Sequence, residues 1–391
     1  MERPGESLLS DRSYLDHAST TLLRPEAAQA MSSWLEQRWA GDPGRVHAEG
    51  HAVRDTLETA RDCLALLLGT TANRVVFTSG ATESANSAIF SARMARSGAP
   101  IICADVEHSC VREAARRCGE VVRLEVDSTG RIDLEHLETL LDADESDQPA
   151  LVNCQWCNHE VGTLQPVAEV VARCRAAGVP VHVDAAAAVG HVSVELDDLG
   201  ADFVSVSAHK LGGPPGVGAL VVRRGLRMEP LIVGGAQERA RRGGLENVVG
   251  IIGFGAAAAA LCEPGRLERE AAAARRLINE LVAAATSVDD VVVLGERVLR
   301  APHIVNVAVG GVLAEAVLLG LDRAGVAAHS GSACSSESIE PSPVLAAMGV
   351  DPDRSLRLSV GWSSTEADVK AFAAAFAPVV ESLRALAGTG T

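Results

Sequence analysis

Between residues 75 and 222, short runs rich in β-branched residues alternate with stretches of helical periodicity. Seven runs have this character: VVFT, PIICADV, VVRLEV, ALVNCQW, VPVHVDA, DFVSVSA and GALVVRR. Strands separated by helices form a mostly parallel or mixed sheet with helices on both faces. The pattern therefore predicts an α/β fold, in which ligands bind at the carboxyl ends of the strands.

The pattern changes after residue 253. An alanine-rich helical stretch, Phe254–Ala285, is broken at Pro264 and is followed by the strand-like runs VVVLG and HIVNVAVGG and by a helical stretch near Glu315–Ala324. A chain of 391 residues has room for two or three compact units. We therefore expect a second, smaller α+β unit.

Composition excludes several classes of partner and location. A formal charge of -16 and a pI near 5.2 disfavour direct binding to nucleic acid or anionic lipid, because such binders usually present a basic face. The nine cysteines are scattered and odd in number, which is typical of a reducing cytoplasm. The N-terminus lacks a basic start and an apolar run, and the run around Ile251–Cys262 is too short to span a bilayer. We expect neither export nor a membrane anchor.

Lysine is rare in this chain, since only Lys210 and Lys370 occur among 35 basic residues. Lys210 stands in SAHKLGGPPG, between a predicted strand and a glycine–proline loop. Partial burial lowers the pKa of a lysine, and a neutral amine forms an imine with an aldehyde, whereas arginine does not deprotonate. The alternative is a surface lysine whose stem packs on apolar neighbours. We favour a reactive amine at Lys210.

The segment TSGATESAN follows the first predicted strand and opens a helix. Free backbone N–H groups and the positive end of the helix dipole at Gly80, Ala81 and Thr82 suit a phosphate group. An ordinary helix cap formed by Ser79 or Thr82 is the alternative.

Asp184 ends the run VHVDA, at the sheet edge that faces a ligand in a doubly wound fold. It either caps a helix over Ala185–Val189 or pairs with a protonated pyridine nitrogen, which makes the ring a better electron sink. A predicted anion site precedes Asp184, and Lys210 follows it by 26 positions. Together these features favour pyridoxal phosphate, held as a Schiff base on Lys210. A nicotinamide site would need GxGxxG, which GGPPGVG does not fit well, and the Walker triplet is missing.

The cysteines carry two different expectations. Cys334 lies in HSGSACSSES, among small and polar residues that favour a loop with a reactive thiol over a buried structural cysteine. Cys154 and Cys157 form a CxxC, but no second pair supplies the remaining metal ligands, and alternation along a strand sends the two thiols to opposite faces. We predict a reactive Cys334 and no metal site.

Two more residues are candidates for contact with cofactor or substrate. His108, in ADVEHSC, follows a strand end on the same sheet edge, where an imidazole can stack on a planar cofactor, move a proton or only cap a helix. Arg357, in SLRLSVGWSS, can offer a bidentate fork to a substrate carboxylate.

These motifs resemble those of the cysteine desulfurases, fold type I pyridoxal-phosphate enzymes of the class-V aminotransferase family. The similarity runs from Tyr14 to Val369, and its most specific parts are TSGATES, EHS, NHEVGTLQP, VDAA, SAHKLGGPPGVGAL, RRGGLENV and SGSACSSESIEPSPVLAAMG. The last motif is similar to that of the group whose cysteine lies in a long loop.

The resemblance implies a large domain over residues 19–260, with a mostly parallel seven-stranded sheet, and a small domain over residues 1–18 and 261–391. It implies an enzyme that converts L-cysteine to L-alanine, carries the sulfur as a cysteine persulfide and delivers it to an acceptor protein. A homodimer is expected on the same ground.

Carried over position by position, the resemblance gives catalytic roles to three residues. Lys210 would bind the cofactor and move protons, Cys334 would take the sulfur, and His108 would lie over the ring. The other contacts would come from Asp184 at the pyridine nitrogen, from Gly80, Ala81, Thr82, Ser207 and His209 around the phosphate, and from Arg357 at the substrate carboxylate.

Three positions depart from the family pattern. His159 replaces an asparagine that contacts cofactor and substrate, Ala187 replaces a glutamine that bonds the phenolic oxygen, and Leu245 replaces a threonine that reaches the phosphate of the partner subunit. Losing one such bond costs about 1–3 kcal/mol if the oxygen stays dry. Two rivals therefore stay open: another pyridoxal-phosphate lyase or aminotransferase, such as one acting on selenocysteine, and a degenerate homologue that serves as a partner-binding scaffold.

Overall fold

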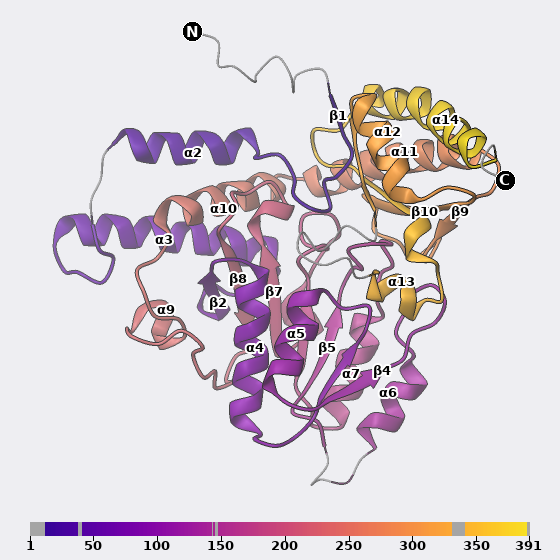
Figure 1. The fold of residues 1–391 in the computed structure, drawn as a ribbon. Coiled ribbons are helices and arrows are strands. Elements are labelled where there is room, and N and C mark those ends of the chain that lie inside the picture. The colour runs from indigo at the N-terminus through magenta and orange to yellow at the C-terminus, as the bar shows by residue number, and fades with distance from the viewer. Residues whose placement is uncertain (1–11, 38–40, 143, 145–147, 331–340, 389–391) are drawn as a thin grey trace.

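The computed structural model describes residues 12–37, 41–142, 144, 148–330 and 341–388. A seven-stranded sheet forms the centre of the larger unit, in the order β2-β8-β7-β6-β5-β3-β4 (Figure 1). Neighbouring strands are parallel except for β8, which is antiparallel to both β2 and β7. The strands are β2 (Val75–Thr78), β3 (Ile101–Ala104), β4 (Val121–Leu124), β5 (Leu151–Gln155), β6 (Val181–Asp184), β7 (Phe203–Ser207) and β8 (Gly218–Val222).

Helices cover both faces of this sheet. One face packs against α4 and α5 around Ile89 and Val111, and the other packs against α3, α6, α7 and α10 around Leu64, Leu137 and Phe254. Strands buried on both faces read as near-continuous apolar runs, as β3 and β8 do, whereas the equally buried β5 and β6 also carry polar residues. The helices of this unit are α2 (Pro25–Glu36), α3 (Ala48–Leu67), α4 (Ala81–Ala95), α5 (Ser109–Cys118), α6 (Leu134–Leu141), α7 (Val167–Ala176), α8 (Leu196–Leu199), α9 (Gln237–Ala240) and α10 (Val248–Leu261).

The smaller unit is built on a four-stranded antiparallel sheet, β12-β13-β10-β9, that packs against α11, α12 and α14 around Phe372 and Phe376 (Figure 1). Near the N-terminus, β1 pairs in parallel with β11 and so joins this unit. The elements of this unit are β1 (Ser13–Tyr14), α11 (Arg266–Thr286), β9 (Val291–Leu294), β10 (Ile304–Val309), α12 (Ala314–Arg323), β11 (Val326–Ala327), β12 (His329–Ser330), β13 (Ser355–Ser359) and α14 (Glu366–Gly388). The short helix α13 (Pro343–Ala347) packs through Val344 and Leu345 against the core of the larger unit.

The predicted fold class is confirmed: a large, mostly parallel seven-stranded sheet lies beside a smaller α+β unit. The expected break at Pro264 separates α10 from α11, which are bent by 83°. No single helix in the described ranges has the length and apolar character needed to cross a bilayer, although α10 and α11 taken together do. The domain boundaries at residues 18 and 260 remain predictions.

Candidate active site

A cavity of about 690 Å³ lies where β5, β6 and β7 end, at their last residues Gln155, Asp184 and Ser207. This is the edge at which an α/β sheet binds ligands. The predicted site residues that line it are Gly80, Ala81, Thr82, His108, His159, Asp184, Ser207, His209, Lys210 and Arg357. Ala187 lines the cavity too, whereas Leu245 is 61% exposed, and Cys334 lies outside the described residues.

The start of α4 lines the cavity with Gly80, Ala81 and Thr82. Gly80 is the N-cap of α4 and no side chain caps the helix, so the alternative of a cap by Ser79 or Thr82 is wrong. The N–H groups of a first helical turn lack partners within the helix. A Cβ at Gly218 of β8 would lie 2.6 Å from the Cα of Gly80, so glycine lets this turn rest on the sheet edge. The site therefore suits a phosphate.

Asp184 presents a buried carboxylate to the cavity. Its Oδ1 accepts a hydrogen bond from the N–H of Ala186 at 3.0 Å, but turns and not a helix follow β6, so the helix-cap alternative is wrong. Burial raises the pKa of Asp184, while the positive charge of Lys210 lowers it. A buried carboxylate is stabilised by a cationic partner, and a protonated pyridine nitrogen is such a partner.

Lys210 ends a short 3-10 helix, Ala208–Lys210, that directly follows β7. Its backbone carbonyl lies 3.1 Å from Nε2 of His191, which helps to fix this turn. Burial lowers the pKa of Lys210, and the nearby carboxylate of Asp184 opposes that shift. Lys210 thus lines a cavity beside Asp184, which contradicts the surface-lysine alternative and favours a reactive amine.

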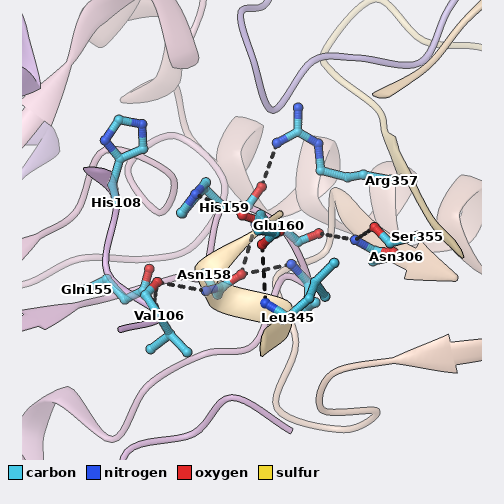
Figure 2. Close-up of polar contacts among 12 residues, drawn as sticks. Val106, His108, Gln155, Asn158, His159, Glu160, Asn306, Leu345, Ser355 and Arg357 are labelled. Carbon is cyan, nitrogen blue, oxygen red and sulfur yellow. Dashed lines mark hydrogen bonds and ion pairs between the residues drawn. The ribbon is translucent and has the colours of Figure 1, made fainter. Parts of the chain in front are cut away.

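Two imidazoles lie side by side on another part of the wall, as Figure 2 shows. The rings of His108 and His159 meet edge to face with centroids 4.9 Å apart. His108 also caps α5, because its Nδ1 accepts from the N–H of Cys110 at 3.2 Å. Burial, reinforced by the charge of Lys210, lowers the pKa of His108 to about 4. At neutral pH the ring is therefore uncharged and carries its proton on Nε2.

The turn after β5 is held by two residues of the NHE motif (Figure 2). Asn158 accepts hydrogen bonds from the N–H groups of Glu160 and Val161, at 2.9 and 2.8 Å, and donates to the carbonyl of Val106 at 3.1 Å. Oε2 of Glu160 accepts from Ser342, the N-cap of α13, at 2.7 Å. Burial raises the pKa of Glu160 to about 7. Asn158 and Glu160 therefore shape the wall, a role that the motif alone did not reveal.

Arg357 is the cation contributed by the small sheet. Its Nη1 donates to the carbonyl of His159 at 2.8 Å, and its Nη2 donates to Asp16 at 2.8 Å and to Ser19 at 2.6 Å. Sequence reasoning did not single out Asp16 or Ser19. The available signal was the run YLDHASTT at the start of the similarity, but nothing in its pattern pairs it with residue 357.

Other cavity residues also escaped sequence reasoning, among them Thr20, Cys110 and Gln155. The two thiols of the CxxC are buried: Cys154 lies within β5, and Cys157 lies on the cavity wall. Within the part of the chain that the structure describes, no group of three or more His, Cys, Asp or Glu side chains is arranged to hold a metal ion.

Comparison with known proteins shows which family this architecture belongs to. The family model for the class-V aminotransferases matches residues 13–372. Cysteine desulfurase IscS of Dictyoglomus turgidum is 38% identical over 95% of both chains, and cysteine desulfurase IscS 1 of Archaeoglobus fulgidus is 36% identical over 95% of this chain and 98% of its own. The crystal structure of a NifS-like protein from Rickettsia africae superposes with a TM-score of 0.86 at 28% identity, covering 95% of this chain and 99% of that one.

The chain therefore belongs to the class-V aminotransferase family, whose cofactor is pyridoxal phosphate. Its similarity within that family is to the cysteine desulfurases. The cavity fits the cofactor, because the start of α4 suits a phosphate, Asp184 suits a cationic ring nitrogen, and Lys210 offers an amine.

Proposed function

We propose that this chain is a pyridoxal-phosphate-dependent cysteine desulfurase, which converts L-cysteine to L-alanine and passes the sulfur to one of its own cysteines. The observation that carries the proposal is the half-buried amine of Lys210, which shares one cavity with Asp184 and the uncapped start of α4. Relatives that are 36–38% identical over nearly the whole chain are named cysteine desulfurases.

The cofactor, when bound, supplies an electron sink that stabilises negative charge at the substrate α-carbon. Lys210 would hold its aldehyde carbon through the side-chain amine, and Asp184 would keep the ring nitrogen protonated. The phosphate would be held by Gly80, Ala81 and Thr82 at the start of α4 and by Ser207 and His209 at the end of β7.

Arg357 and His108 act on the substrate in this proposal. The guanidinium of Arg357 binds the substrate carboxylate through charge-assisted hydrogen bonds. Because burial lowers the pKa of Lys210, its neutral amine takes the α-proton when substrate is bound. His108 would offer its Nε2–H to the substrate from the cavity wall, and His159, which lies against it, would contact cofactor and substrate.

Cys334 is the proposed sulfur acceptor. Its thiolate attacks the substrate sulfur, so that a sulfur–sulfur bond forms as the carbon–sulfur bond breaks, and the carbon fragment takes up protons to become alanine. The enzyme is left with a persulfide, which an acceptor protein then removes.

The variant Cys334→Ser tests this assignment. It should keep the visible absorption of the cofactor and still bind L-cysteine, yet release no sulfide under reducing conditions and form no persulfide detectable by mass spectrometry. Cys118→Ser, in a half-buried position at the end of α5, is the matched control and should behave as the wild type. Sulfide release from the Cys334→Ser protein at the wild-type rate would overturn the persulfide step.

Partners and location follow from the same proposal. We expect a homodimer in the cytoplasm, with L-cysteine as substrate and no direct contact with nucleic acid or membrane. Sedimentation of the purified protein measures the assembly, and mass spectrometry of proteins captured after loading with labelled cysteine identifies the acceptor. Alanine formed from L-cysteine and from selenocysteine, measured separately, distinguishes a desulfurase from a selenocysteine lyase.

A further inference from the structure

A residue that does not line the cavity holds Arg357 in place. Arg357 and Ser19 line the cavity, whereas Asp16 is not among its lining residues in the described part of the chain. The side chain of Arg357 is only 3% exposed, and that of Asp16 is 18% exposed. Asp16 therefore contacts the guanidinium without itself lining the cavity.

The contacts form a closed triangle. Nη2 of Arg357 donates to Oδ1 of Asp16 at 2.8 Å and to Oγ of Ser19 at 2.6 Å, and the hydroxyl of Ser19 donates to the same Oδ1 at 2.9 Å. Both hydrogens of Nη2 are thus engaged, and one hydrogen of Nη1 is bound by the carbonyl of His159 at 2.8 Å. A guanidinium has five N–H donors, so Nη1 keeps one for a ligand.

Nε is the remaining donor, and it is buried without a hydrogen-bond partner among the described residues. A buried guanidinium always carries its charge, so its position depends on the acceptors around it. Asp16 is the carboxylate that contacts it directly, at a sequence separation of 341 residues.

We propose that Asp16 is a positioning residue for substrate recognition: it fixes the guanidinium of Arg357 so that one Nη1–H points at the carboxylate of the amino-acid substrate. This inference rests on the proposed role of Arg357 as the carboxylate ligand. It assigns Asp16 to binding and not to the chemical step, so its removal acts on KM and leaves kcat nearly intact.

The geometry supplies a rescue variant. Both hydrogen bonds that Asp16 accepts end on Oδ1, and an asparagine amide presents an equivalent oxygen there. Asp16→Asn therefore keeps the triangle while removing the charge, and Asp16→Ala removes both. Ser19→Ala removes only the bridging hydroxyl.

The experiment measures KM and kcat for L-cysteine and, by cofactor absorption, the dissociation constant of the product L-alanine. Asp16→Ala should raise KM and the dissociation constant by about ten-fold or more with kcat within about three-fold, since one charged hydrogen bond is worth that much. Asp16→Asn should stay within about three-fold of the wild type, and Ser19→Ala should fall between the two. Asp322→Ala, which breaks a surface ion pair with Arg12, is the control and should change neither value.

Arg357→Gln, measured in parallel, separates this inference from the proposed function. If Arg357→Gln binds L-alanine weakly but Asp16→Ala has a normal KM, the Asp16 inference is overturned and the proposed function stands. An Arg357→Gln protein that binds L-alanine normally overturns both. A loss in kcat at constant KM for Asp16→Ala, or a loss in Asp16→Asn equal to that in Asp16→Ala, also contradicts positioning by the triangle. A melting curve for each variant shows that it folds.

Discussion

The two walls of the cavity are held in place by different kinds of contact. On the wall formed by the large sheet, Asp184, Ser207 and Lys210 sit at or just after strand ends, and the hydrogen bonds described at Asp184 and Lys210 span only 2 and 19 residues. On the wall formed by the small sheet, Arg357 is fixed by contacts with Asp16, Ser19 and His159, which are 198 to 341 residues away in sequence. The first wall suits the cofactor, and the second suits the substrate.

The difference indicates a division of labour. Groups that hold a cofactor belong on a rigid scaffold, because small displacements cost reactivity. Groups that recognise a substrate can come from a second unit whose packing brings them into register. Substitutions on the sheet wall should therefore alter cofactor chemistry and kcat, whereas substitutions on the small-sheet wall should alter KM.

The largest expected effect comes from Lys210. Lys210→Ala should lower alanine formation by about 10³-fold or more, because an amine that moves the substrate proton is lost. Lys210→Arg should not rescue it, since arginine stays protonated. Lys370→Ala, at the other lysine, which is exposed, is the control and should keep full activity. Initial rates and the visible spectrum of the cofactor check the prediction. Near-normal turnover in Lys210→Ala would contradict the view that the wall formed by the large sheet holds the cofactor.

A substitution at Asp184 tests the same wall, with a smaller expected effect on activity. Asp184→Asn keeps an oxygen for the N–H of Ala186 but loses the charge that pairs with a protonated ring nitrogen. The value of a hydrogen bond to a charged group predicts a kcat lower by about 10- to 200-fold with little change in KM. Steady-state kinetics decide, with exposed Asp198→Asn as control. A rise in KM without loss of kcat would assign Asp184 to the substrate and break the division.

The same contrast explains what the sequence predicts. Seven strand runs, the glycine-led helix start and the residues at strand ends follow from local periodicity, and the structure places them as expected. Asp16, Ser19 and Glu160 act through contacts between distant segments, such as the bond from Ser342 to Glu160, and such pairings leave no local pattern. Arg357 was named from the sequence as a possible ligand for a substrate carboxylate, but arginine is so frequent here that its identity says little, and the family resemblance gave it this role.

The pH dependence of stability at Glu107 tests whether the wall formed by the large sheet holds this carboxyl in a dry site. Its Oε1 accepts from the N–H of Gln155 at 2.7 Å, and burial raises its pKa to about 8 from 4.5. Between those values the folded chain binds more protons than the unfolded chain, so this carboxyl makes the protein less stable as pH rises. Glu107→Gln, which carries no charge, should match the wild type at about pH 5 and be more stable at about pH 8 by roughly 2 kcal/mol.

Denaturant unfolding at the two pH values measures this difference. Glu113→Gln, an exposed change on α5, is the control and should show no pH-dependent gain. Equal stability of Glu107→Gln and the wild type at both pH values would mean that the carboxyl is not held in a dry site.

The smallest predicted effect concerns Ala187, where the cofactor wall departs from the family pattern. Ala187 lines the cavity and is 6% exposed, so a longer side chain there reaches into the space beside Asp184 and Lys210. Ala187→Gln should slow the loss of cofactor on dilution by about five-fold, the value of one net hydrogen bond of about 1 kcal/mol. Ala187→Leu adds bulk without a donor and should not slow it. If leucine slows the loss as much as glutamine does, packing and not hydrogen bonding limits cofactor retention at this wall; if glutamine speeds the loss, the wall already satisfies the cofactor without the family glutamine.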